Sequence, residues 1–238
     1  MKLLLDVGNS RVKWAWADDG GLSPQTAVGR DGMAAALDRL GAERRADQVL
    51  CSVVADTEVE DVLLDWCRNA YDMEARFARV EKTCHGLVNA YADPSSMGVD
   101  RWMAMLGAAE LTEGAFCVVD SGTAITVDRV DPEGRHLGGW ILPGVELMSR
   151  SLAAGTARVS PDGRSMQDAW GRNTQECVAA GVQAAVDGSM LRMMSLLEEK
   201  SDAIFVTGGA AEAVMPVLGE RGRLVPDLVL RGLLHWSQ

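Results

Sequence analysis

Short apolar runs alternate with segments of helical periodicity along the chain. The first apolar run begins at Leu3 and ends at Asp6-Val-Gly. A second apolar run follows directly after the turn, which predicts a pair of strands around a tight turn. Strands are further predicted at 26–28, 48–54, 75–80, 138–142 and 203–207, with a hairpin at 116–130; helices are predicted at 32–40, 58–70, 98–111, 144–153, 173–198 and from 210. Strands that alternate with helices predict an α/β class with mixed sheets.

The opening pattern occurs twice. Phe116-Cys-Val-Val-Asp120-Ser-Gly repeats Leu3-Leu-Leu-Asp6-Val-Gly, and in both copies a second strand follows the turn directly. The copies are about half the chain apart, too far for a solenoid, whose repeats span roughly 20–50 residues. The repeat therefore predicts two similar domains, at residues 1–113 and 114–238.

The two Asp-x-Gly turns admit two interpretations. Asp and Gly favour hairpin turns through their backbone geometry alone. However, a carboxylate that ends a buried strand is costly unless it is paired or holds a cation, whereas a glycine turn presents N–H groups to an anion. Two copies favour phosphate-binding loops with an associated metal ion. The sequence contains neither a Walker loop nor G-x-G-x-x-G, so the P-loop and Rossmann alternatives lose support.

Composition narrows the classes of partner. The 238 residues carry a net charge of -11, which argues against nucleic-acid binding but leaves a small anionic ligand possible. The five cysteines include no C-x-x-C pair, so zinc spacing is absent and free thiols in a reducing cytoplasm are expected. We see no secretory signal and no apolar run of about 18 residues, so no membrane association is predicted.

Six motifs give the chain a family resemblance. They are Asp6-Val-Gly-Asn-Ser10, Gly98-Val-Asp-Arg101, Asp120-Ser-Gly-Thr-Ala124, Gly138-Gly-Trp-Ile-Leu-Pro-Gly144, Asn173-Thr174 and Thr207-Gly-Gly209. In this order they resemble type III pantothenate kinase, within the superfamily of actin, the heat-shock chaperone ATPases and the sugar kinases. Ser10 stands where many members of the family have Thr, and it keeps the hydroxyl.

The resemblance implies two tandem ribonuclease H-like (actin-like ATPase) domains, each a mixed sheet flanked by helices, with the active-site cleft between them. It implies a homodimer that uses ATP to phosphorylate pantothenate to 4'-phosphopantothenate, the first step of coenzyme A biosynthesis. The implied cofactors are Mg²⁺ with the ATP and a monovalent cation, K⁺ or NH₄⁺.

The resemblance also assigns residues. Asp100 is the implied general base on the substrate hydroxyl, although a carboxylate there could simply complement the N-terminus of its helix. Pantothenate contacts are implied at Tyr91, Gly98, Val99, Asp100, Arg101 and Thr174, the last across a dimer interface. ATP contacts are implied at Asp6, Val7, Gly8, Asn9, Ser10, Arg11, Val12, Lys13, Thr123, Gly208 and Gly209. Asp6 would hold Mg²⁺ through the phosphates and Asp120 the monovalent cation.

Several of these residues have simpler explanations. Tyr91 could be a half-buried loop aromatic, Thr174 a helix cap, and Thr207–Gly209 a plain strand-to-helix turn. Lys13 could face the phosphates or solvent. The histidines His85, His136 and His235 have no carboxylate partner in a motif and are interpreted as structural.

Two alternatives to pantothenate kinase remain open. One is another kinase or a phosphatase of the same superfamily, because a fold does not determine a substrate. The other is a non-enzymatic regulatory accessory factor. A degenerate regulator should have lost a catalytic carboxylate, whereas Asp6, Asp100 and Asp120 are all present.

The segment Cys177–Leu197 offers a hint of assembly. Its apolar stripe, which suits either a dimer interface or the domain core, comprises Val178, Val182, Ala185, Val186, Met190, Met193, Met194 and Leu197.

Overall fold

The computed structural model describes residues 1–54, 57–155, 170–197 and 202–238 and has the predicted α/β architecture. Its contacts group the chain into two compact units. Unit 1 consists of Met1–Ala115, Asp128–Gly138 and Pro226–Gln238, and unit 2 of Phe116–Val127 and Gly139–Val225. The predicted repeat boundary between residues 113 and 114 stays a prediction.

Unit 1 is built on a mixed sheet. Its strands are β1 (Lys2–Val7), β2 (Arg11–Asp18), β3 (Gly21–Leu22), β4 (Thr26–Gly29), β5 (Gln48–Val53) and β6 (Arg76–Phe77). They lie in the order β3-β2-β1-β5-β6, with β4 also paired to β2. β1 is antiparallel to β2 and parallel to β5, so the predicted opening hairpin forms the middle of the sheet.

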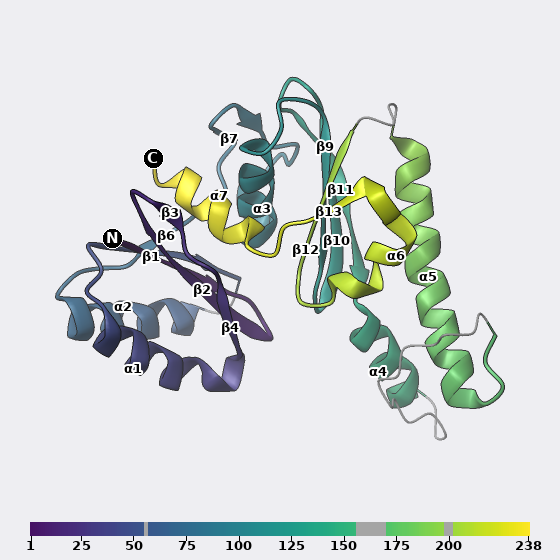
Figure 1. The fold of residues 1–238 in the computed structure, drawn as a ribbon, viewed down its shortest axis with the longest axis horizontal. Helices are drawn as coiled ribbons and strands as arrows, with labels where there is room; N and C mark the ends of the chain where they lie inside the picture. The colour runs from purple at the N-terminus through teal and green to yellow at the C-terminus, as the bar shows by residue number, and fades with distance from the viewer. Residues whose placement is uncertain (55–56, 156–169, 198–201) are drawn as a thin grey trace. The chain divides into compact units, whose positions relative to one another are not determined.

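Helices cover both faces of this sheet (Figure 1). On one face lie α1 (Met33–Glu43) and α2 (Thr57–Tyr71), preceded by the 3₁₀ turn η1 (Arg30–Gly32). Leu3 and Leu5 of β1 pack there against Leu37 and Leu63. Because side chains alternate along a strand, Leu4 and Asp6 point to the opposite face, where α7 (Leu228–Trp236) contacts β1 and α3 (Val99–Ala109) contacts β5.

Two glycines let α3 and α7 touch along their backbones. A Cβ on Gly232 would overlap the Met103 carbonyl oxygen, and one on Gly107 would overlap the Leu228 carbonyl oxygen. Our element prediction did not include α7. The buried residues Leu228, Val229, Leu230 and Leu233 show that it belongs to the core of unit 1.

A loop region and a hairpin tip complete unit 1. The loop contains β7 (Thr83–Cys84), β8 (Leu87–Val88) and the 3₁₀ turn η2 (Pro94–Ser96). The tip is the segment Asp128–Gly138, and it is tied to the loop by the Val88 N–H, which donates to the Gly134 carbonyl at 2.9 Å. This bond brings the tip beside the segment that carries Tyr91.

Unit 2 is built on a second sheet with the same pattern of connections. Its strands are β9 (Phe116–Ser121), β10 (Ala124–Val130), β11 (His136–Pro143), β12 (Ala203–Thr207) and β13 (Gly222–Leu224), in the order β11-β10-β9-β12-β13. The first strand of each sheet lies in the middle, between its hairpin partner and a parallel later strand. The predicted repeat is therefore confirmed as two sheets of equivalent topology.

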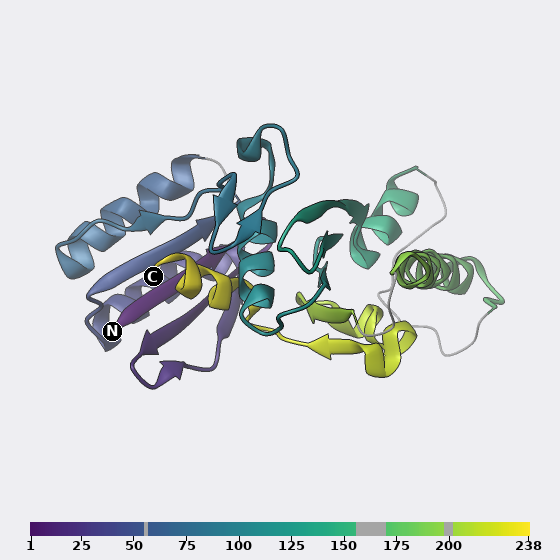
Figure 2. The same ribbon diagram turned by 90° about the horizontal axis from the view of Figure 1, so that it is seen from above.

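The helices of unit 2 are α4 (Val145–Gly155), α5 (Thr174–Leu196) and α6 (Met215–Leu218), with the 3₁₀ turns η3 (Ala211–Ala213) and η4 (Gly219–Arg221). Figure 2 looks along the axis of α5. Val186, Met190 and Met193 of α5 are buried in the core with β9, β10 and β12. This part of the apolar stripe is domain core, the simpler of the two explanations.

Three element predictions need correction or qualification. The strand predicted at 75–80 forms ladder pairs only at Arg76 and Phe77. The helix predicted from Ala210 is instead η3 followed by the single turn α6, because Pro216 allows only a helix start there and Gly219, at φ 57°, ends it. The predicted end of the 173–198 helix, residue 198, lies outside the described residues. None of the described helices is long and apolar enough to cross a membrane.

Candidate active site

The first Asp-Gly hairpin makes a tight turn in unit 1. The Gly8 N–H donates to the Arg11 carbonyl at 3.0 Å, and the Arg30 N–H donates to the Ser10 carbonyl at 3.0 Å. The side chains of Asn9, Ser10 and Arg11 are exposed around the turn. The side chains of the flanking Val7 and Val12 are buried, so these two residues could meet a ligand only through their backbone groups.

Asp6 and Lys13 face each other across this hairpin. They are register partners in β1 and β2, and Lys13 Nζ lies 3.9 Å from Asp6 Oδ2. Asp6 is only 6% exposed. Because the lysine side chain is mostly covered as well, it lies beside the carboxylate rather than extending freely into solvent.

The second Asp-Gly hairpin lies in unit 2, next to the glycine turn that follows β12. Asp120 of β9 is the register partner of Thr207, and the Ala210 N–H donates to the Ser121 carbonyl at 2.9 Å. Gly208 has φ 97°, and a Cβ there would overlap both the Ser121 carbonyl and the Asp120 carboxylate. The structure thus brings Asp120 and Gly208 together, and only glycine fits at 208.

Thr123 and Gly144 extend the same loop cluster. The Gly144 N–H donates to the Thr123 carbonyl at 2.9 Å, and a Cβ on Gly144 would overlap the Gly122 carbonyl. Thr123 is exposed at the turn and Gly209 is exposed in the facing one. Three of the six sequence motifs therefore meet at one edge of the second sheet.

Asp100 stands in the first turn of α3, after Gly98 as N-cap. Its Oδ1 accepts a hydrogen bond of 2.8 Å from the Arg101 N–H. Burial raises the pKa of the Asp100 carboxyl above its ordinary value of 3.8, and the hydrogen bond and charge of Arg101 offset only part of that rise. The carboxylate therefore both complements a helix N-terminus and has the elevated proton affinity that suits a general base.

Arg101 lies at the centre of a buried polar cluster. Its Nε donates to Asp128 Oδ2 at 2.9 Å and its Nη2 to Asp128 Oδ1 at 2.6 Å, while Nη1 donates to Tyr91 Oη at 3.1 Å. Burial lowers the pKa of Arg101, but the bonds to Asp128 more than offset this and raise it overall. Arg101 is 6% exposed and remains fully charged.

His136 completes this cluster, so this histidine, which we interpreted as structural, has a buried carboxylate partner outside the six motifs. Its Nε2 lies 3.0 Å from Asp128 Oδ1, and its ring stacks on Tyr91 with 6.2 Å between centroids. His235 also meets a carboxylate, since Nδ1 lies 3.0 Å from Glu110 Oε1. The partners are distant in sequence or outside the motifs, so our search for motif-borne carboxylates missed both.

The loop that carries Tyr91 is held by a buried amide. Asn89 is 1% exposed, and its Oδ1 accepts from the Tyr91 N–H at 2.8 Å. Lys82 Nζ donates to the carbonyls of Asn89 and Tyr91 at 2.7 and 3.1 Å. Tyr91 is therefore a half-buried loop aromatic, and these bonds fix it in the cluster with Arg101 and His136.

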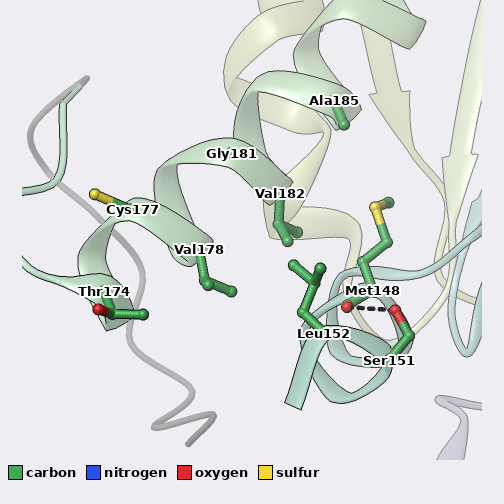
Figure 3. Close-up of a pocket in the computed structure, with 9 residues that line it drawn as sticks. All are labelled: Met148, Ser151, Leu152, Thr174, Cys177, Val178, Gly181, Val182 and Ala185. Atoms are coloured by element: carbon green, nitrogen blue, oxygen red, sulfur yellow. Dashed lines mark hydrogen bonds between the residues drawn. The ribbon is translucent and has the colours of Figure 1, made fainter. Parts of the chain in front are cut away.

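Thr174 lies apart from these groups, at the start of α5. The cap of this helix is Asn173, whose Oδ1 accepts from the Glu176 N–H at 2.9 Å, so Thr174 is not the cap. Thr174 instead lines a groove of about 500 Å³ between α4 and α5. Figure 3 shows Leu152, Val178 and Val182 pointing toward one another in this groove, with Thr174 at its end.

Solved structures identify the fold. A Campylobacter jejuni protein described as a Baf family transcriptional activator superposes with a TM-score of 0.63 and 21% identity, covering 98% of this chain and 95% of its own. The activator of 2-hydroxyisocaproyl-CoA dehydratase from Clostridium difficile, with bound ADPNP, gives 0.56 and 12%, covering 99% and 92%. The chain has the two-domain fold of the actin-like ATPases and sugar kinases.

Sequence comparison places the chain within that class. The family model for type III pantothenate kinase matches residues 2–195. The type III pantothenate kinase of Halorhodospira halophila is 38% identical over 100% of this chain and 98% of its own length. The chain belongs to the type III pantothenate kinase family.

Proposed function

We propose that this chain transfers the γ-phosphoryl group of ATP to the terminal hydroxyl of pantothenate, giving 4'-phosphopantothenate for coenzyme A biosynthesis. The observation that carries the proposal is the pairing, in a member of this family, of Asp100 with Arg101. A carboxylate with raised pKa and a charged guanidinium stand side by side at the start of α3. An acceptor that carries both a hydroxyl and a carboxylate needs such a pair.

On the acceptor side, Asp100 orients the hydroxyl and accepts its proton as phosphoryl transfer proceeds. Arg101 binds the pantothenate carboxylate, because a guanidinium offers paired N–H donors that match carboxylate geometry. Tyr91 and the backbone of Gly98 and Val99 border this side.

On the donor side, the two Asp-Gly hairpins bind ATP. Gly8, Asn9, Ser10 and Arg11 offer a turn with exposed polar groups, and Lys13 supplies the positive charge next to Asp6. Asp6 would hold Mg²⁺ through the phosphates, and the ion would supply neutralising charge for the transferring group. Thr123, Gly208 and Gly209 contact the nucleotide from the second hairpin and the facing glycine turn.

Asp120 is the proposed ligand of a monovalent cation, K⁺ or NH₄⁺. Support comes from its place near the end of β9, where its carboxylate and the Ser121 carbonyl both border Gly208. Carboxylate and carbonyl oxygens are the ligand type that hard cations prefer.

Pantothenate-dependent turnover tests the function. With MgATP and K⁺, the purified protein is expected to release ADP only when pantothenate is present, with one phosphopantothenate formed per ADP. A pantothenate analogue without the terminal hydroxyl is the control, and it should give no ADP. ADP release that is indifferent to pantothenate, or a faster reaction with another small hydroxyl acid, would contradict the assignment.

We further propose that the chain acts in the cytoplasm as a homodimer joined through α4 and α5. Four leucines on these helices are 42–55% exposed: Leu147, Leu152, Leu191 and Leu196. They lie on the same two helices as the groove that holds Thr174. Large apolar side chains exposed on these two helices suit a protein partner, and closed two-fold dimers are the commonest oligomers.

A charged substitution at Leu152, which lines the groove, tests the proposed dimer. Leu152→Glu should convert a 51 kDa species (twice the 25.5 kDa chain) to a monomer in light scattering and should lower turnover together with mass, since Thr174 would lose its partner subunit. Glu220→Gln, at an exposed site in η4, is the matched control. A wild-type protein that is fully active as a monomer would rule the proposal out.

A further inference from the structure

Two buried residues of the Arg101 cluster have no role in the function proposed above. Asp128 is 1% exposed and His136 is 3% exposed. Both lie on the hairpin tip Asp128–Gly138, which belongs to unit 1 although its strands begin in the second sheet. A buried carboxylate is costly unless it is paired, and Asp128 has its partners in Arg101 and His136.

The geometry shows that Asp128 holds one edge of the guanidinium. Both of its oxygens accept from Arg101, at 2.9 Å from Nε and 2.6 Å from Nη2. Such a two-point contact defines the plane of the guanidinium as well as its position. Arg101 therefore cannot swing as a free arginine side chain does.

His136 in turn holds Asp128. Its Nε2 lies 3.0 Å from the same Oδ1 that accepts from Arg101 Nη2. An ionised carboxylate can only accept, so Nε2 carries the proton and donates. The ring also stacks on Tyr91, whose hydroxyl accepts from Arg101 Nη1. His136 thus supports the arginine through two routes, Asp128 and Tyr91.

Part of the Arg101 guanidinium remains available for a ligand although Asp128 and Tyr91 hold it. Of its five N–H donors, three have partners: one each on Nε, Nη1 and Nη2. The other two, on Nη1 and Nη2, have no partner among the residues that the structure describes. These two nitrogens form the edge of the guanidinium that can receive a second carboxylate.

We propose that Asp128 and His136 are positioning residues that hold Arg101 so that its remaining N–H donors meet the pantothenate carboxylate. The inference rests on the proposed function and on Arg101 as the carboxylate-binding group. An arginine held in advance loses little rotamer freedom when the substrate binds. Asp128 and His136 therefore strengthen the binding of pantothenate and do not affect the phosphoryl-transfer step.

The test separates this role from a purely structural one. Asp128→Asn and His136→Phe are each expected to raise the KM for pantothenate about tenfold or more, the scale of losing a partner that orients a binding group. The KM for ATP and kcat should change by less than about threefold. His136→Gln, which keeps an N–H donor toward Asp128, should restore most of the affinity.

A neutral analogue of the substrate tests whether the effect on KM depends on the pantothenate carboxylate. When an alcohol replaces the pantothenate carboxylate, the wild-type and variant enzymes should have similar KM values, because the group that Arg101 recognises is gone. The matched control is Asp131→Asn in the same hairpin tip. Asp131 Oδ2 accepts from Nε of Arg135 at 2.7 Å, and Arg135 is not a member of the cluster, so this variant should leave the pantothenate KM unchanged.

Several outcomes would overturn the proposal. One is a rise in the KM for the neutral analogue as large as the rise in the KM for pantothenate. A second is a parallel rise in the KM for ATP. A third is failure of both Asp128→Asn and His136→Phe to fold, which would make the cluster purely structural. A wild-type enzyme that does not phosphorylate pantothenate would instead refute the proposed function, so the two failures are distinguishable.

Discussion

Asp100→Asn is expected to lower kcat by about 10²–10⁴-fold, the range for loss of a general base. The fold and the KM for both substrates should change little, because an asparagine side-chain oxygen can still accept the 2.8 Å bond from the Arg101 N–H. Steady-state kinetics with circular dichroism would check both parts. Asp61→Asn, an exposed acid on α2, is the control.

The raised pKa of Asp100 gives this prediction a pH signature. Only the ionised carboxylate accepts a proton, so kcat should fall as the pH drops through the pKa of Asp100, which lies above 3.8. Stability should show the converse. When folding raises the pKa of a carboxyl, the protein loses stability as the pH rises from the unfolded-state pKa of that group to its folded-state pKa.

Asp100→Asn should therefore have a higher Tm than the wild type at neutral pH, and the difference should vanish at acid pH. Near-normal turnover in the variant would leave Asp100 with only its role at the helix N-terminus. A neutral-pH Tm below that of the wild type would show that the carboxylate is stabilising, contrary to the effect of its burial.

The second large effect is expected at Asp120. The wild-type enzyme should need K⁺ or NH₄⁺ in addition to Mg²⁺, and Asp120→Ala should lower turnover in K⁺ by about 10²-fold or more, since a bound cation contributes several kcal/mol of charge stabilisation. The variant should also lose any difference between K⁺ and Na⁺ buffers. The measurement is kcat in matched chloride salts at constant ionic strength.

The comparison of salts carries its own control. Glu220→Ala removes an exposed acid from the same unit and should keep the K⁺ dependence of the wild type. Equal activity of the wild-type enzyme in Na⁺ and K⁺ would mean that Asp120 does not hold a functional monovalent cation. Its carboxylate would then serve only the loop packing next to Gly208.

The sequence predicted the sheets well because their signals are local. Each Asp-x-Gly turn interrupts a fully apolar run, and both copies form the central hairpin of a sheet. Asp100 and Arg101 could be named for the same reason, since a family motif carries them together.

What the sequence did not reveal depends on tertiary contacts. Asp128 and Arg101 are 27 residues apart, and nothing in the local pattern around either predicts the pair. The helix α7 was missed for a different reason. Its sequence LVLRGLLHW is mostly apolar and only nine residues long, which is too short for periodicity to separate a buried helix from a buried strand.

The crossing of α3 and α7 has a consequence for biogenesis. Unit 1 takes its last helix from residues that are synthesised after all of unit 2. Gly107 and Gly232 seat that helix directly against the one that carries Asp100. Domains usually fold on the ribosome in the order of their synthesis. While unit 2 is being synthesised, the first sheet therefore lacks α7 on one of its faces. We expect the helix that carries Asp100 to acquire its final packing only when residues 228–236 leave the exit tunnel.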